Sequence, residues 1–317
     1  MSPTEYVLAL DVGGTGMKAA LLGPSASGPP VPLYRAHRPT GAGRGPEAVV
    51  ASVLEFAAEL RAHGVAEYGV EPVAAGVAVP GIVDGGEGTV VYSANLGWRQ
   101  LPLRTLLEAR LGVPVALGHD VRTGGLAEGR IGAGAGVDRF LFVSVGTGIA
   151  GAIGIDGRVE AGAHGGAGEI GHITVRSDGP ACGCGRRGCL ETLASAAAVG
   201  RAWALASGVP GATAADAARA VASGDARAAT VWADAVAAFA DGLLTALTLL
   251  DPRTLIIGGG LAEAGDVLFL PLREAVGERV TFQRVPAIVP AALGETAGCL
   301  GAGLLAQDLI EAEVTSR

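Results

Sequence analysis

The sequence contains few aromatic residues and few basic ones. Aromatic side chains make up 4% of its 317 residues, although 50% of all residues are hydrophobic. Lysine is almost absent, because Lys18 is the only one and arginine supplies the other basic side chains. The net charge is −8, whereas a protein that binds nucleic acid usually presents a basic face. The charge balance therefore argues against a nucleic-acid partner and favours a small-molecule substrate.

Long uninterrupted hydrophobic runs are also missing. The most apolar long stretch, residues 231–250, is interrupted by Asp234 and Asp241, so it falls short of a transmembrane span. Near the N-terminus, Glu5 and Asp11 flank an apolar run that is too short for a signal peptide. We therefore expect a cytoplasmic protein with no membrane partner.

Two segments of the chain share one pattern, in which an apolar strand, a turn rich in Gly and Thr, and a second apolar strand follow one another. The first segment is 6–22, with its turn at 11–16, and the second is 140–155, with its turn at 146–148. A chain of this length is sufficient for two domains. We infer a duplicated α/β unit that forms two lobes facing each other across a cleft.

After the first hairpin, a Gly- and Pro-rich stretch is followed by a predicted helix. Residues 24–46 are rich in Gly and Pro and are expected to form a loop or an irregular strand. Pro46 occupies a first-turn position and begins a helix, because apolar side chains then recur at helical spacing. We expect this helix to stop at Gly64 and to pack one face on a sheet.

Further buried strands are predicted by short apolar runs, at 73–79, 113–117 and 255–257. Ligand-facing residues of α/β proteins lie at such strand ends, and the second of these runs ends in Gly118-His119-Asp120. A carboxylate there can accept the proton of an attacking hydroxyl, so Asp120 is the candidate general base. The alternative is that Asp120 only caps a helix that starts at Val121.

Glycine-rich turns that follow apolar strands can bring backbone N–H groups close to a phosphate, because glycine has no Cβ. Gly146, Gly148 and Gly151 match a dinucleotide fingerprint, but the chain continues into a strand there, so a Rossmann fold is rejected. A Walker A sequence is absent as well. Any one turn could simply close a hairpin. Asp11 beside the first turn and Thr147 within the second favour a nucleotide site instead.

A cluster of soft metal ligands is the most specific signal. His172 is followed by Cys182, Cys184 and Cys189 in a glycine-rich loop. Three thiolates and one imidazole complete a tetrahedral zinc shell with no open position, which is typical of a structural zinc. The alternatives are a disulfide or inert buried thiols. Cys299, in an apolar stretch, is expected to be an ordinary core thiol.

Two glutamates flank this cluster. Glu169 comes three residues before His172, and Glu191 comes two residues after Cys189. A zinc ion that orders the loop would also fix both carboxylates, and rigid carboxylates are suitable acceptors for sugar hydroxyls. Without the zinc, each would more often be a solvated surface residue.

Six motifs occur along the chain: Asp11-Val-Gly-Gly-Thr15, Val79-Pro-Gly-Ile-Val83, Asn95-Leu-Gly-Trp98, Gly146-Thr-Gly-Ile149, Glu169-Ile-Gly-His172 and Cys182-x-Cys184-x4-Cys189-x-Glu191. With these motifs the sequence resembles the ROK family (repressor, open reading frame, kinase), and in particular its bacterial glucokinases, over essentially the whole chain. It departs from the family pattern at two positions, because many members have Asn in place of His119 and Gly in place of Ala150.

The resemblance implies a fold and a domain division. The fold is α/β, a two-lobed actin/hexokinase-like (RNase H-like) ATPase fold with duplicated βββαβα units. Residues 1–120 with 301–317 would form the small N-terminal lobe, and 121–300 the large C-terminal lobe that carries the zinc loop. Family members are commonly dimers or tetramers, so a homo-oligomer is expected.

The resemblance also implies a reaction, in which the γ-phosphoryl group of Mg-ATP moves to the 6-hydroxyl of glucose. Asp120 would be the catalytic base, and ATP, Mg²⁺ and structural Zn²⁺ the cofactors. The substrate-binding residues would be Gly81, Asn95, Asp120, Glu169, His172 and Glu191. The cofactor-binding residues would be Asp11, Gly13, Gly14, Thr15, Lys18, Thr147, Gly148, Gly258, Gly259 and Gly260, and the metal ligands His172, Cys182, Cys184 and Cys189.

Other activities remain open at this point. A kinase for N-acetylglucosamine, N-acetylmannosamine, mannose or fructose differs from a glucokinase in pocket shape, which the sequence does not show. A sugar-binding protein without turnover would leave Asp120 idle. Repressors of the family carry an N-terminal helix-turn-helix extension, whereas the first strand here is expected at about Tyr6, so we favour a kinase.

Overall fold

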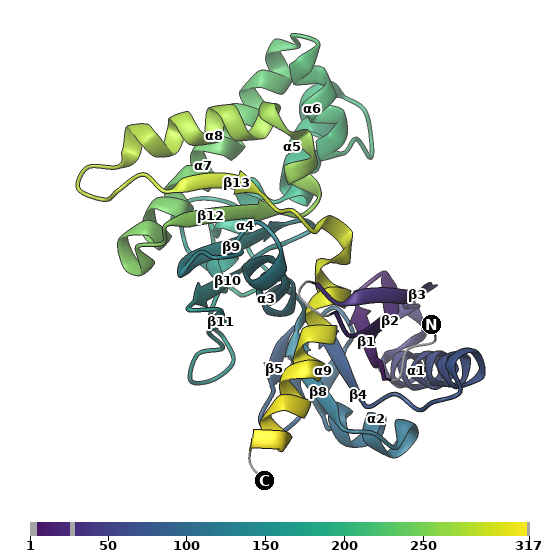
Figure 1. Cartoon of the computed structure of the whole chain (residues 1–317). Helices are drawn as coiled ribbons and strands as arrows, with labels where there is room; N and C mark the ends of the chain where they lie inside the picture. The colour runs from purple at the N-terminus through teal and green to yellow at the C-terminus, as the bar shows by residue number, and fades with distance from the viewer. Residues whose placement is uncertain (1–4, 26–28, 316–317) are drawn as a thin grey trace. The chain divides into compact units, whose positions relative to one another are not determined.

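The structure is a computed structural model that describes residues 5–25 and 29–315 (Figure 1). Contacts divide the chain into two compact units. Unit 1 consists of Met1–Ala127, Ala161–Gly166 and Glu295–Arg317, and unit 2 consists of Glu128–Glu160 and Ala167–Gly294. The predicted lobes, 1–120 with 301–317 and 121–300, stay a prediction.

Unit 1 is built on a five-stranded sheet with the order β3-β2-β1-β4-β8. The first two strand pairs are antiparallel, and the pairs β1-β4 and β4-β8 are parallel. The irregular strand expected within 24–46 is β3, which pairs with β2 through a register shift between Leu21 and Leu22. The bounds are β1 (Val7–Val12), β2 (Gly16–Gly23), β3 (Val31–Pro39), β4 (Ala74–Val79) and β8 (Val115–His119).

Helices cover both faces of this sheet. The helices α1 (Pro46–Tyr68) and α2 (Leu103–Leu111) share a hydrophobic core with one face. The helix α9 (Ala297–Thr315) packs on β4, β1 and β8. The remaining elements of unit 1 are η1 (Ala42–Arg44), α3 (Asp120–Ile131), which continues into unit 2, and a small sheet of β5 (Ile82–Asp84), β6 (Thr89–Ser93) and β7 (Trp98–Leu101).

The predicted stop of the first long helix at Gly64 is wrong. The helix α1 continues to Tyr68 and ends at Gly69, which adopts the left-handed conformation with φ 72°. Gly64 is buried, and a Cβ there would overlap the hydroxyl group of Tyr6. The glycine therefore makes room for a packed tyrosine rather than ending the helix.

Unit 2 repeats the topology of unit 1. Its sheet has the order β11-β10-β9-β12-β13, again with two antiparallel pairs followed by two parallel pairs. This repetition confirms the predicted α/β class and its duplicated unit. The bounds are β9 (Arg139–Val145), β10 (Ile149–Ile155), β11 (Arg158–Val159), β12 (Thr254–Gly258) and β13 (Ala287–Pro290).

One long apolar helix lies at the centre of the helical layer of unit 2. The helix α7 (Ala226–Leu250) is long and apolar enough, by length and composition alone, to cross a membrane. Half of its most apolar window is buried, and side chains such as Trp232 and Phe239 belong to the hydrophobic core of the unit. It contacts η2 (Ile170–His172), α4 (Leu190–Ala194), α5 (Ala196–Ser207), α6 (Ala214–Ala222) and α8 (Asp266–Arg279). The other short helices are η3 (Gly260–Ala264) and η4 (Gly294–Thr296), and the chain passes from unit 2 to unit 1 within η4.

Packing of α9 on β4 gives a stability prediction. A Cβ on Gly76 would overlap the backbone carbonyl of Ala302, which a rigid strand and helix cannot avoid. Gly76→Ala should therefore lower the free energy of unfolding by about 1–3 kcal/mol. Gly43→Ala is the matched control, because a Cβ at Gly43 meets no atom within 4 Å. Urea unfolding followed by circular dichroism compares the two, and equal stabilities would contradict the packing argument.

Candidate functional site

The turn between β1 and β2 is held in place by bonds to a residue from beyond β3. The N–H of Gly13 donates to the carbonyl of Gly16 at 2.9 Å. The side chain of Thr40 donates to the carbonyl of Gly13 at 2.6 Å, and its N–H donates to the carbonyl of Thr15 at 3.0 Å. Thr40 is fully buried, so the glycine-rich turn is a fixed feature of unit 1. No motif in the sequence pointed to Thr40.

Asn95 lies beside this turn. A Cβ built on Gly14 would be 3.6 Å from the Cβ of Asn95, which is exposed in the segment between β6 and β7. Gly81, at the end of β4, has φ 113°, and a Cβ there would overlap the carbonyl of Tyr92. Gly81 is therefore required by the backbone. Its predicted contact with sugar stays a prediction.

Two carboxylates interact at the carboxyl ends of β1 and β8. Burial raises the pKa of Asp11 from its ordinary value to about 6, and the negative charge of Asp120 adds to this shift. Lys18, directly opposite Asp11 in the register of β1 and β2, acts in the other direction. The pair thus carries an excess of negative charge, and a divalent cation would compensate it.

Asp120 is the first residue of α3, and its side chain is 29% exposed. Its Oδ1 atom accepts a hydrogen bond from the N–H of Val121, the next residue, at 2.7 Å. A capping side chain accepts an N–H two or three residues further on, and here His119, the buried last residue of β8, accepts the N–H of Arg122. The role of Asp120 as a cap and its role as base both stay predictions.

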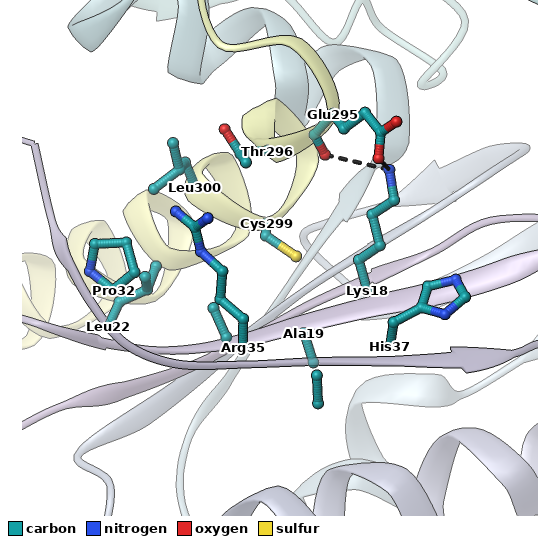
Figure 2. A pocket seen from close by; sticks show the side chains of 12 residues that line it. Lys18, Ala19, Leu22, Pro32, Arg35, His37, Glu295, Thr296, Cys299 and Leu300 are labelled. Carbon is teal, nitrogen blue, oxygen red and sulfur yellow. Dashed lines mark hydrogen bonds and ion pairs between the residues drawn. The ribbon is translucent and has the colours of Figure 1, made fainter.

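Lys18 faces a cavity of about 270 Å³ in unit 1, which Figure 2 shows from close by. Its Nζ atom lies 2.9 Å from a carboxylate oxygen of Glu295. The two side chains are 37% and 80% exposed, so solvent screens this ion pair and it adds little to stability. Cys299 lines the same cavity, and burial raises the pKa of its thiol to about 12, which confirms an ordinary core thiol.

In unit 2 the turn between β9 and β10 contacts Glu191. The N–H of Gly146 donates to the carbonyl of Gly148 at 2.9 Å, and the N–H of Ile149 donates to Oε2 of Glu191 at 3.0 Å. A Cβ on Gly148 would overlap this carboxylate. A predicted phosphate turn and a predicted sugar-binding residue are therefore neighbours, which the sequence did not indicate.

The predicted metal ligands come together in one cluster. The ligand atoms of His172, Cys182, Cys184 and Cys189 all lie within 4.8 Å of one another. The Sγ atom of Cys182 is 3.6 Å from Nδ1 of His172, and the Sγ atoms of Cys184 and Cys189 are 3.6 Å apart. Zn–S bonds of about 2.3 Å and Zn–N bonds of about 2.0 Å give tetrahedral S–S and S–N edges of about 3.8 and 3.5 Å. The residues therefore fit a zinc ion.

This geometry favours a metal site over the two alternatives, a disulfide and inert buried thiols. All four cysteines of the chain lie in the described part, and all are free thiols. Cys184 is exposed, so the cluster is not simply a set of core thiols. Since Nδ1 of His172 faces Cys182, the Nε2 atom is left for another partner, and Glu169 begins the same short helical turn.

A second cavity, of about 380 Å³, opens in unit 2 beside a third glycine-rich turn, Gly258–Gly260, which follows β12. Gly259 has φ 82°, and a Cβ there would be 2.6 Å from the carbonyl of Val145. The turn thus packs directly against β9. The cavity is lined by residues that include Ala214, Ala218, Arg219, Trp232, Gly260 and Glu263.

Residues 7–309 match the ROK family. The chain belongs to the ROK family. The glucokinase of Halalkalibacterium halodurans is 34% identical, over 96% of this chain and 96% of its own length. The structure of a ROK hexokinase from Thermus thermophilus has a TM-score of 0.83 and 33% identity, and covers 97% of this chain and 99% of the other. The structure of a ROK family glucokinase from Streptomyces griseus, in complex with glucose and AMPPNP, has a TM-score of 0.78 and 30% identity, over 96% of this chain and 99% of that one.

This ROK chain carries its predicted site residues on both units. The structure brings Asp11 and Asp120 together in unit 1, and in unit 2 it brings the four predicted metal ligands together and places Glu191 against Gly148. Unit 1 holds Asp11, Gly13, Gly14, Thr15, Lys18, Gly81, Asn95 and Asp120, and unit 2 holds Thr147, Gly148, Glu169, His172, Cys182, Cys184, Cys189, Glu191, Gly258, Gly259 and Gly260.

The raised pKa of Asp11 predicts a pH-dependent cost. Between about pH 4 and pH 6 the folded protein keeps a proton on Asp11 that the unfolded chain releases, so this group lowers stability as the pH rises. Asp11→Asn should remove that cost and gain on the order of 2 kcal/mol relative to wild type between pH 4 and pH 7.

Urea unfolding at both pH values, in magnesium-free buffer without a chelator so that bound zinc stays, measures the gain. The exposed Asp178 gives the matched control, Asp178→Asn, which should show no such gain. An Asp11→Asn variant whose difference from wild type is the same at both pH values would contradict a raised pKa.

Proposed function

We propose that this ROK protein is an ATP-dependent glucokinase that transfers the γ-phosphoryl group of Mg-ATP to the 6-hydroxyl of glucose. One observation carries most weight: Asp120 interacts electrostatically with the half-buried Asp11, which lies beside a glycine-rich turn held by Thr40. A base, a carboxylate suited to a cation and a phosphate turn are the parts that phosphoryl transfer requires. The glucokinases and hexokinase to which the chain is similar over nearly its full length support the same activity.

In the proposed reaction Asp120 accepts the proton of the 6-hydroxyl as the sugar oxygen attacks the γ-phosphorus in line. The new bond joins that oxygen to phosphorus, while the bond from phosphorus to the β-γ bridging oxygen breaks and ADP leaves. Catalysis is mainly positioning and charge stabilisation, and exclusion of water prevents hydrolysis. Asp11 would hold Mg²⁺, which supplies positive charge to the phosphates when it is bound.

The nucleotide contacts would come from the three glycine-rich turns. Backbone N–H groups of Gly14, Thr15, Thr147 and Gly148 would face the phosphates, while the N–H of Gly13 keeps its bond to the carbonyl of Gly16. Lys18 would be released from its weak ion pair with Glu295. The adenosine would bind near Gly258–Gly260, where the cavity of about 380 Å³ has an aromatic and aliphatic lining that suits a base.

The sugar contacts would come from Gly81, Asn95, Asp120, Glu169, His172 and Glu191. A structural zinc on Nδ1 of His172 would leave the Nε2 atom for a sugar hydroxyl. Glu191 already accepts the N–H of Ile149 through Oε2, so a sugar hydroxyl would bind its other oxygen. A ROK kinase for another hexose, or a sugar sensor without turnover, is the alternative. A cytoplasmic location and a homo-oligomeric state stay predictions.

The first test is ADP release from Mg-ATP over a panel of hexoses, with glucose binding measured in parallel by calorimetry. We expect strong turnover with glucose and a kcat that is about 10²- to 10⁴-fold lower in Asp120→Asn. Turnover with a different hexose would keep the mechanism and change the substrate. Glucose binding by the wild type with no turnover would favour the sensor.

The zinc has its own test. A structural zinc can supply about 10–16 kcal/mol of apparent binding energy, so its loss should unfold the loop that carries Glu169 and Glu191. Cys184→Ser should lose zinc and raise the KM for glucose while lowering kcat, each by about tenfold or more. Metal analysis by mass spectrometry should find one zinc per wild-type chain, and Cys299→Ser is the control that keeps it. Normal kinetics in a zinc-free variant would remove the zinc from the proposal.

A further inference from the structure

The imidazole of His119 lies between two parts of the start of α3. Its Nδ1 atom accepts a hydrogen bond from the N–H of Arg122 at 3.3 Å. Its Nε2 atom is 3.3 Å from Oδ1 of Asp120. The ring is 6% exposed, so its orientation is fixed by packing as well as by these contacts. One side chain thus contacts both the first turn of the helix and the proposed base.

The hydrogen bond at Nδ1 sets the tautomer of the ring. A nitrogen that accepts an N–H carries no proton, so the proton of neutral imidazole is on Nε2. Burial lowers the pKa of His119, and Arg122 lowers it further, whereas Asp120 raises it. The ring is therefore neutral at neutral pH, and its Nε2–H group faces the Asp120 carboxylate.

We propose that His119 is a positioning residue for the phosphoryl transfer: it orients the Asp120 carboxylate so that Oδ2, and not Oδ1, takes the proton of the sugar hydroxyl. The inference rests on the proposed kinase function. Oδ1 already accepts the N–H of Val121 at 2.7 Å, so two donor groups face the same oxygen from two sides. The terminal torsion of an aspartate is otherwise broad, and rotation about it would exchange the two oxygens.

Substitution of His119 by Asn or by Gln allows its two contacts to be separated. An asparagine amide places an oxygen near the position of Nδ1, so it can accept the N–H of Arg122. The same side chain is too short to reach the position of Nε2, and so it cannot contact Asp120. A glutamine has the opposite properties, because its terminal amide reaches the Nε2 position and lacks an acceptor at Nδ1.

The experiment compares wild type, His119→Asn and His119→Gln in full-length, zinc-loaded protein. We expect His119→Asn to lower kcat about tenfold and to change the KM for glucose less than about twofold, because the base is misplaced while the sugar contacts remain. His119→Gln should recover most of the lost kcat. Thermal unfolding of both variants verifies that they fold.

A kcat that is higher in His119→Asn than in His119→Gln overturns the inference. If His119 only caps α3, the Asn variant keeps full kcat and the Gln variant is impaired. Equal losses of kcat in both variants, or a loss that is entirely in the KM, overturn it as well.

Nitrogen NMR of the imidazole separates a failure of this inference from a failure of the proposed function. The signals of His119 are assigned by their absence from the spectrum of His119→Asn. We expect the Nε2–H tautomer at pH 7.5, and this measurement needs no turnover. A Nδ1–H or doubly protonated ring overturns the positioning role, whereas an absence of turnover with every hexose overturns the kinase function alone.

Discussion

The close approach of α9 to the sheet of unit 1 is the constraint on which the proposed chemistry depends. Glycines in both elements make the approach possible. A Cβ on Gly298 would overlap the carboxylate of Asp11, and one on Gly301 would overlap the backbone carbonyl of Thr123 in α3. Since α3 begins with Asp120, the same contact that seats α9 also brings the start of α3 towards Asp11. Gly298 and Gly301 of α9 thus help to set the separation between Asp11 and Asp120.

In unit 2 the predicted sugar-binding residues Glu169 and Glu191 are also positioned by close packing at a glycine. A Cβ on Gly171 would overlap the carbonyl of Ile149, so the short helical turn that ends in His172 is pressed against the start of β10. From the other side, Glu191 accepts the N–H of Ile149. The metal cluster joins these two segments, because His172 belongs to the first and Cys189 immediately precedes the helix that carries Glu191. The backbone of Ile149 therefore contacts both the segment that carries His172 and the segment that carries Glu191.

The sequence predicts those features that depend on neighbouring residues. Strands β1, β4, β9 and β12 are continuous apolar runs, the turns after them are marked by glycine, and the metal ligands by their spacing. Distant contacts have no such signal. Gly64 was misread as a helix stop because Tyr6, which requires it, is far away in the chain. The bonds from Glu191 to Ile149 and from Lys18 to Glu295 span 42 and 277 residues. Only the folded chain shows that these groups meet.

The charges around Asp120 explain why a neutral imidazole suits this position. A histidinium beside Asp120 would form a strong ion pair, and a carboxylate in such a pair would be a poorer acceptor for the sugar proton. Burial opposes that state by lowering the pKa of His119, while the nearby Asp11 holds further negative charge that burial also disfavours. A neutral Nε2–H group can then hold one oxygen of Asp120 without neutralising it. The burial of the site thus keeps the imidazole a donor and the carboxylate a base.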